Sequence, residues 1–211
     1  MDQQNEHLKN LSEIRSLMES STKFLSLSGL AGVFIGIFAL CGALAAYLYL
    51  SLDFFSDNYY DRLSSGRSFN FGNVAFFTTD AIIVLILALA AGILLTIRKA
   101  RKNGQAIWNK AVKKFLINLF IPLIAGGLFC LALLFHHNIS LIAPAMLVFY
   151  GISLVSASVF TYNMIRYLGY CEILLGLIAC LFVGYGLIFW AVGFGLLHII
   201  YGIAMRYKYE R

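Results

Sequence analysis

Long apolar runs, separated by short polar segments, dominate this sequence. The polar residues gather in residues 1–24, 51–74, 98–114 and 206–211, and most of what lies between them is apolar. A soluble fold of 211 residues could not bury so much apolar surface, since 61% of the residues are hydrophobic and only 12% are charged. The sequence therefore predicts an all-α polytopic membrane protein.

The lengths of the apolar runs set the number of crossings. A helix needs about 20 apolar residues to cross about 30 Å of hydrocarbon. The run at residues 168–205 holds 38 residues, enough for two crossings, with Gly184 at the turn and Trp190 at an interface. We expect a compact bundle of six transmembrane helices within residues 24–206. They are predicted at residues 24–50, 74–97, 115–135, 141–162, 167–184 and 187–206.

The basic residues predict how the chain is oriented. Lys and Arg near the ends of crossings are retained on the cytoplasmic side. With both termini cytoplasmic, 14 of the 16 basic residues lie inside, and only Arg62 and Arg67 lie outside. We expect a cell membrane protein whose residues 51–73 form an extracytoplasmic loop.

Residues 1–23 precede the first crossing and carry apolar residues at helical spacing. Leu8, Leu11, Ile14 and Met18 recur among charged and polar residues, which predicts a short amphipathic helix on the cytoplasmic side. This helix would lie on the membrane surface, dock on a partner, or pack against the protein's own loops.

Residues 98–114 form a basic cytoplasmic loop without an acidic residue. We expect its cations to contact anionic lipid headgroups. They are Arg98, Lys99, Arg101, Lys102, Lys110, Lys113 and Lys114. From Ile107 onwards the spacing predicts an interfacial helix that leads into the third crossing. Nucleic-acid binding is not expected, because no stacking platform or recognition motif accompanies the charge.

Small residues recur at helical spacing within the crossings. In lipid, helices associate through close backbone approach. We expect one set of small residues to mediate packing within the bundle or across a homodimer. The set is Ser28, Gly32, Gly36, Ala88, Gly92, Gly195 and Gly202.

Three ionisable side chains fall inside crossings, where a charge costs about 2.5–3.5 kcal/mol. Asp80, Glu172 and His198 are therefore a candidate intramembrane polar site, each on a face with small residues. Glu172 is expected about 6 Å inside the cytoplasmic boundary, bound to a donor on another helix or in the basic loop. His198, near mid-membrane, either bonds to a hydroxyl or backbone carbonyl or pairs with Glu172 as a proton or cation site.

No cofactor, metal site or catalytic group is predicted. The histidines at 136 and 198 differ too much in depth to share a haem, and the acids of residues 51–73 are too few for calcium. The cysteines show no ligand spacing, and we expect them to be small buried hydrophobes. They are Cys41, Cys130, Cys171 and Cys180.

Two functions fit this pattern. The first is a non-enzymatic binding, regulatory or accessory membrane subunit that docks a protein partner. The alternative is a small ion- or proton-coupled transporter or channel that uses Asp80, Glu172 and His198 in the bundle interior.

Overall fold

The computed structural model describes residues 27–50, 71–104 and 107–209. The amphipathic helix predicted at residues 1–23 and most of the loop at residues 51–73 lie outside this part of the chain. Within it the chain is helical, without a strand. The long helices are α2 (Gly29–Leu50), α4 (Phe71–Lys102), α5 (Lys110–Phe135), α6 (Ile142–Ala157) and α7 (Asn163–Leu181). The last crossing joins α8 (Gly186–Trp190), the π-helix η3 (Ala191–Leu197) and α9 (His198–Tyr209).

Six helical segments of the described chain are long and apolar enough to cross a membrane. The fourth runs over residues 139–160, because the 3-10 turns η1 (Ile139–Leu141) and η2 (Ser158–Phe160) extend α6 at both ends. The predicted class, a compact bundle of six membrane-spanning helices, is confirmed.

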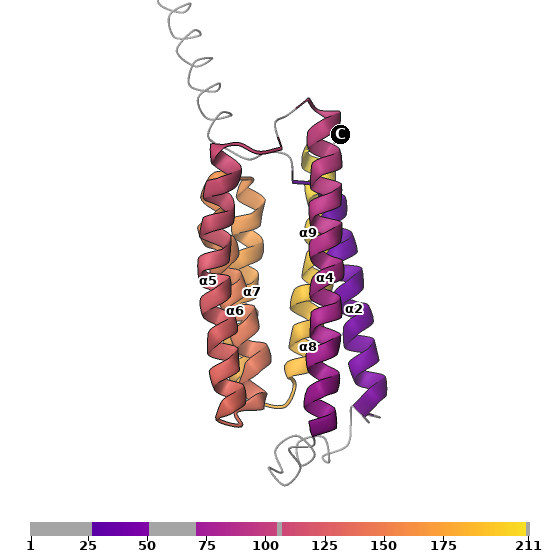
Figure 1. Ribbon diagram of the computed structural model, residues 1–211, viewed down its shortest axis with the longest axis vertical. Helices are drawn as coiled ribbons and strands as arrows, with labels where there is room; N and C mark the ends of the chain where they lie inside the picture. Colours follow the sequence, from indigo (N-terminus) through magenta and orange to yellow (C-terminus); the bar gives the residue numbers. More distant parts are fainter. Residues whose placement is uncertain (1–26, 51–70, 105–106, 210–211) are drawn as a thin grey trace, which may run out of the picture.

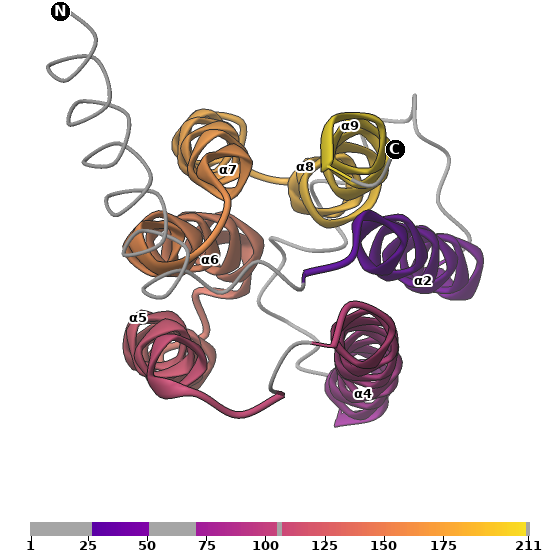
Figure 2. The ribbon, with the colours of Figure 1, turned by 90° about the horizontal axis from the view of Figure 1, so that it is seen from above.

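The helices stand side by side in two rows (Figures 1 and 2). In one row α6 lies between α5 and α7, and in the other α2 lies between α4 and the last crossing. The rows meet where α6 and α7 contact α8, η3 and α9. Each helix thus packs beside its neighbours in sequence except across the basic loop, where α4 and α5 stand apart.

Glycines set the closest helix contacts. A methyl group built on Gly32 would lie 3.1 Å from the Gly202 Cα, and one on Gly36 would lie 2.5 Å from the Gly195 carbonyl oxygen. Gly151 of α6 meets the backbone of α7 at Gly169 in the same way. In lipid such close backbone approach is what holds helices together.

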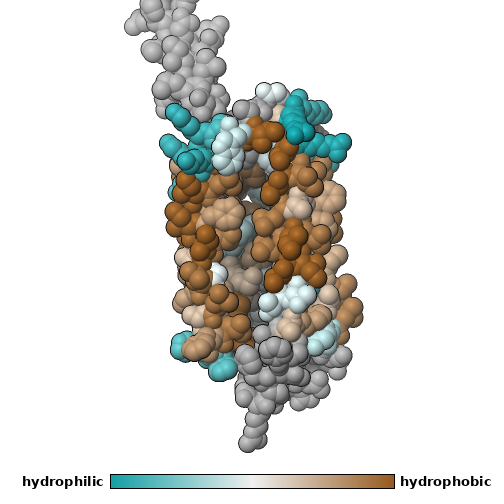
Figure 3. All heavy atoms as spheres, viewed as in Figure 1, coloured by the Kyte–Doolittle hydropathy of each residue, from teal (hydrophilic) through white to brown (hydrophobic). Residues whose placement is uncertain are grey.

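Large apolar side chains cover the outside of the bundle. The side chains of Leu44, Ile86, Ile121 and Leu128 are each more than half exposed, while Ala39 and Ala46 are buried. Brown, hydrophobic residues accordingly cover most of the face shown in Figure 3, with teal residues at its ends. This distribution suits a hydrocarbon solvent and would be unfavourable in water.

The ends of the crossings differ from the predicted boundaries by a few residues. Residues 98–102 continue α4, and α5 begins at Lys110, where the Asn109 side chain accepts a hydrogen bond from the Val112 backbone N–H at 2.8 Å. The turn after α7 contains Gly184 at φ 101°, a left-handed conformation that favours glycine. Trp190, expected at an interface, is the fifth residue of the last crossing, where it ends α8 and packs on Phe194 with ring centroids 5.4 Å apart.

Candidate functional site

Glu172 lies at the centre of α7 and is completely buried. It is the tenth of the 19 residues of Asn163–Leu181, so at about 1.5 Å per residue it is about 14 Å from either end. The side chain has 0% exposure, on the face that also buries Gly169 and Gly176. The helix α7 begins four residues before the predicted crossing at residues 167–184, so Glu172 lies further from the end of its helix than the sequence indicated.

Neither carboxylate oxygen of Glu172 has a hydrogen-bond partner among the described residues. The nearest cationic candidate is His198, whose Nδ1 lies 3.5 Å from Glu172 Oε1. That distance allows an ion pair if the ring is protonated but is too long for a good hydrogen bond. Buried polar atoms are nearly always hydrogen-bonded in native structures, so this carboxyl group stands out.

His198 is held by two other groups. Its Nδ1 lies 3.0 Å from the carbonyl oxygen of Gly193, and its Nε2 lies 2.8 Å from the hydroxyl of Tyr150. A carbonyl can only accept, so Nδ1 carries the proton, and in the neutral ring Nε2 accepts from Tyr150. His198 thus bonds to a hydroxyl and a carbonyl, as the first alternative predicted, and its ring also lies beside Glu172. That the two residues form a proton or cation site stays a prediction.

The three residues come from three crossings at the same depth. Tyr150 is the twelfth residue of the 22-residue segment at 139–160, and His198 is the thirteenth of the 24 residues of Gly186–Tyr209. With Glu172 at the centre of α7, the site lies halfway along the helices of the bundle. Tyr150 was not predicted, because a neutral tyrosine in an apolar run carries no charge signal; its central position in the fourth crossing was the available clue.

Gly193, in the π-helix η3, lies directly against the Glu172 carboxyl group. A methyl group built on Gly193 would lie 2.6 Å from Glu172 Oε2 and would also collide with the side chain of Leu147. Only glycine leaves room for the carboxyl group there. Single π-helical turns are frequent at functional sites, because the wider turn alters which backbone groups are available.

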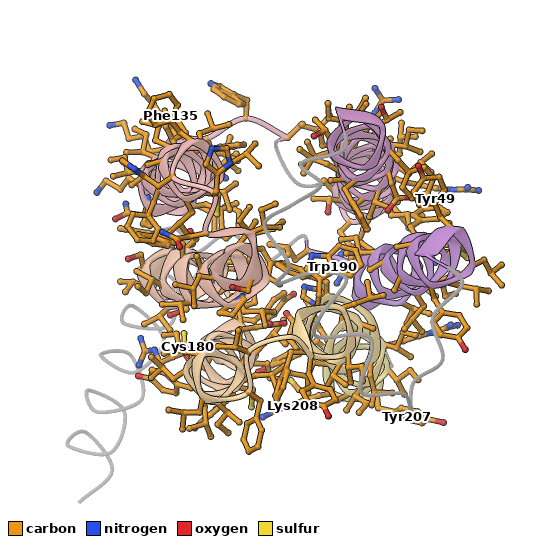
Figure 4. All side chains as sticks on the ribbon, turned by 90° about the horizontal axis from the view of Figure 1, so that it is seen from below. Tyr49, Phe135, Cys180, Trp190, Tyr207 and Lys208 are labelled. Carbon is orange, nitrogen blue, oxygen red and sulfur yellow. The ribbon has the colours of Figure 1, made fainter. Side chains whose placement is uncertain are left out.

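An aromatic row leads from the bundle interior to this site. Trp190 packs on Phe194, and the Phe194 ring lies 5.0 Å from Tyr150 and 6.1 Å from His198, centroid to centroid. Figure 4 shows Trp190 between the two rows of helices. The last crossing thus presents a row of aromatic side chains to the interior, and this row ends at His198, halfway along the crossing.

Asp80 lies elsewhere. It is half-buried on α4 against α2, where a methyl group built on Gly42 would lie 3.4 Å from its Oδ2. Of the three residues predicted to form one polar site, only Glu172 and His198 lie together, and Asp80 lies apart from them. Tyr150 is the third member of the observed site.

The packing residues predicted on α2 make close backbone contacts, whereas those predicted on α4 do not. Gly32 and Gly36 meet the backbone of the last crossing, at Gly202 and Gly195. Ser28 is buried just before α2, and its carbonyl accepts from the Ala31 N–H at 3.1 Å. On α4, Ala88 is half-buried and Gly92 has only an ordinary contact, 3.7 Å, with Ile35.

The basic residues predicted to contact headgroups lie at the C-terminal end of α4 and the N-terminal end of α5, which form the same end of the bundle. Lys99 is half-buried and donates to the Leu27 carbonyl at 2.6 Å. Lys114 is exposed, 6.0 Å from the ring of Phe160. The remaining residues are exposed: Arg98, Arg101, Lys102, Lys110 and Lys113.

The cysteines are free thiols, and the prediction that they are buried is wrong for three of them. Cys41, Cys171 and Cys180 are exposed on the outer surface of their helices, whereas Cys130 is half-buried. In a membrane these thiols face lipid, where a small apolar group is equally acceptable. Among the described residues, no group of three His, Cys, Asp or Glu side chains could hold a metal ion.

No protein-family model matches this chain, and neither a curated protein nor a solved structure shows significant similarity to it. The six apolar helices make it compatible with a multi-pass membrane protein.

Proposed function

We propose that this multi-pass membrane protein is a small proton-coupled transporter, and that Glu172 is the group that takes up and releases the proton. One observation carries the proposal: a fully buried carboxyl group at mid-membrane has no hydrogen-bond partner among the described residues. Ionisable groups at this depth are costly and belong to ion or proton pathways by default. No covalent chemistry is assigned to the protein.

Protonation would change what Glu172 needs from its surroundings. As a carboxylate it requires a nearby donor or cation, and His198, 3.5 Å away, is the group that could supply either. As a carboxylic acid it is neutral, which suits its contacts with Leu147 and Leu175 around Gly193. A site whose two states prefer different environments can couple a proton to a conformational change.

The arrangement of the rows suggests how such a site would be exposed alternately. Glu172 belongs to one row and His198 to the other, and the rows meet mainly along α6, α7 and the last crossing. A small rotation of one row against the other would change the Glu172–His198 distance directly. Such rocking of one half-bundle against another is a common basis of alternating access.

Proton flux in reconstituted liposomes tests this function. A potassium gradient with valinomycin sets the membrane potential, and a trapped pH dye reports internal acidification. We expect wild-type protein to exceed empty liposomes and Glu172→Gln to fall to the empty-liposome rate. Asp80→Asn, which neutralises the carboxyl group against Gly42, is the matched control and should retain wild-type flux.

Equal flux from wild type and Glu172→Gln, both folded by circular dichroism and gel filtration, would exclude Glu172 as the proton carrier. Equal loss in Asp80→Asn would show that any intramembrane carboxyl group matters, and would likewise contradict the assignment.

The same proposal includes an orientation. The exposed basic residues at the inner ends of α4 and α5 should be cytoplasmic, and with them both chain termini, in a cell membrane. The turn at residues 136–138, between the third and fourth crossings, would then be extracytoplasmic.

A second function, an accessory subunit, is favoured by α4. Over Ala75–Lys102 only Val84 and Ala100 are buried, so this helix offers most of its surface to the surroundings. Extraction in a polymer nanodisc followed by native mass spectrometry tests it: an accessory subunit should carry a second protein in fixed stoichiometry. Release as a protomer with lipid alone would count against this function.

A further inference from the structure

One side of the bundle is open among the described residues. α4 packs on α2 and α5 packs on α6, but the two helices face each other across a gap (Figure 2). In the space-filling view the surface is hollowed between the brown walls of α5 and α4 along much of their length (Figure 3). This groove opens sideways, so in a membrane it faces the hydrocarbon.

The helices that flank the groove carry large, exposed aliphatic side chains. Ile86 and Leu94 of α4, and Ile121 and Leu128 of α5, are between 59% and 66% exposed. Contacts between helices in this molecule are built differently, from glycines such as Gly36 and Gly195 whose backbones touch. Membrane helices prefer small residues where they meet one another. The flanks of α4 and α5 are therefore better suited to acyl chains than to another helix.

Among the described residues, lysine and arginine side chains gather at one end of the groove. Arg98, Arg101 and Lys102 are exposed at the inner end of α4, and Lys110 and Lys113 are exposed at the start of α5. In Figure 3 teal residues lie at these upper ends of both walls. At the opposite ends of α4 and α5 the described residues include no lysine or arginine. One cationic end and a long apolar body match an amphiphile with one anionic headgroup.

We propose that the groove between α4 and α5 binds an anionic phospholipid, with its phosphate between the basic ends of the two helices and an acyl chain along the groove. Among the described residues the acidic side chains are Asp80 and Glu172, both within membrane-spanning helices, so the described part of a second copy offers no acidic group that would neutralise these basic ends. An anionic headgroup would.

Native mass spectrometry of the full-length protein in mild detergent tests the site. Phosphatidylglycerol and phosphatidylcholine with identical chains are titrated in parallel. The test variant, Arg101→Gln with Lys113→Gln, removes one exposed charge from each wall. The matched control, Arg206→Gln with Lys208→Gln, removes two exposed charges from the inner end of α9, away from the groove.

We expect wild type to bind one phosphatidylglycerol about tenfold more tightly than phosphatidylcholine, given the attraction that each cation adds near a headgroup. The test variant should lose most of this preference, and the control should keep it. Excess glycerol 3-phosphate, which has the headgroup chemistry without chains, should not displace the lipid.

Four results would overturn the site. They are equal binding of the two lipids, equal loss in both variants, displacement by glycerol 3-phosphate, and a second protein chain bound in place of lipid. None of these readouts depends on proton flux, so the lipid site and the role of Glu172 are tested independently.

Discussion

The hydroxyl of Tyr150 lies 2.8 Å from Nε2 of His198, and this contact joins the fourth crossing to the sixth halfway along the bundle. Because Nδ1 donates to Gly193, the Tyr150 hydroxyl fixes the remaining nitrogen of the ring as an acceptor. The ring is thereby oriented with its Nδ1 edge toward Glu172.

Replacing Tyr150 by Phe should loosen this orientation. We expect proton flux to fall about fivefold to tenfold and the free energy of unfolding to fall by about 1 kcal/mol, the usual worth of an interhelical hydrogen bond in a membrane. Tyr201→Phe is the control, since the Tyr201 hydroxyl donates to the sulfur of Met205 instead. Equal flux in both variants would show that His198 does not depend on Tyr150.

Gly193→Ala should disturb the site while sparing the fold. The added methyl group meets the ends of two flexible side chains, Leu147 and Glu172, rather than backbone. We expect the carboxyl group to be displaced and proton flux to be lost, with the melting temperature lowered by only a few degrees. Wild-type flux in a folded Gly193→Ala protein would mean that the position of the carboxyl group is unimportant.

Glycine contacts between α2 and the last crossing should dominate stability. In Gly36→Ala the methyl group meets the Gly195 carbonyl oxygen at 2.5 Å and the Ile199 backbone nitrogen at 3.0 Å, so backbone must move. We expect a loss of about 1–3 kcal/mol in the free energy of unfolding, measured by titration with a denaturing detergent.

Gly127→Ala is the matched control within α5, because nothing lies within 4 Å of the added methyl group. It should leave stability unchanged or raise it by up to about 1 kcal/mol through helix propensity. Destabilisation of the two variants to the same degree would show that close packing at Gly36 is not what holds the helices together.

The sequence predicted the membrane class and the six crossings because apolar length and charge are local properties. It also singled out Glu172 and His198, since ionisable residues are rare in apolar runs. Glu172 lies further from the end of its helix than the predicted crossing implied, because α7 begins at Asn163 and includes Arg166, whose Nε donates to the Ser158 hydroxyl at 3.2 Å.

The order of the helices around the bundle is not a local property, and here the sequence was insufficient. Asp80 lies on a stripe of small residues, which suggested the same interior as Glu172. That stripe faces α2, and Asp80 meets Gly42 there. Periodicity shows which residues share a face, but not which helix that face will contact.

Cysteine labelling tests the orientation. Asn103→Cys, in the turn after α4, and Ser140→Cys, before α6, both replace exposed residues at opposite ends of the bundle. In a background with the four natural cysteines replaced by alanine, a membrane-impermeant maleimide applied to intact cells should label Cys at 140 and not at 103. The reverse pattern would invert every cytoplasmic assignment.

Infrared difference spectroscopy on the reconstituted protein tests most directly whether Glu172 exchanges a proton at mid-membrane. After a jump from acidic to alkaline buffer, the carbonyl stretch of a protonated carboxylic acid should disappear from the wild-type spectrum. Asp80→Asn should show the same pH-dependent loss as wild type. Glu172→Gln should show no such band at either pH. A band that survives in Glu172→Gln, or a wild-type spectrum that does not change with pH, would contradict the assignment of this buried carboxyl group as the proton carrier.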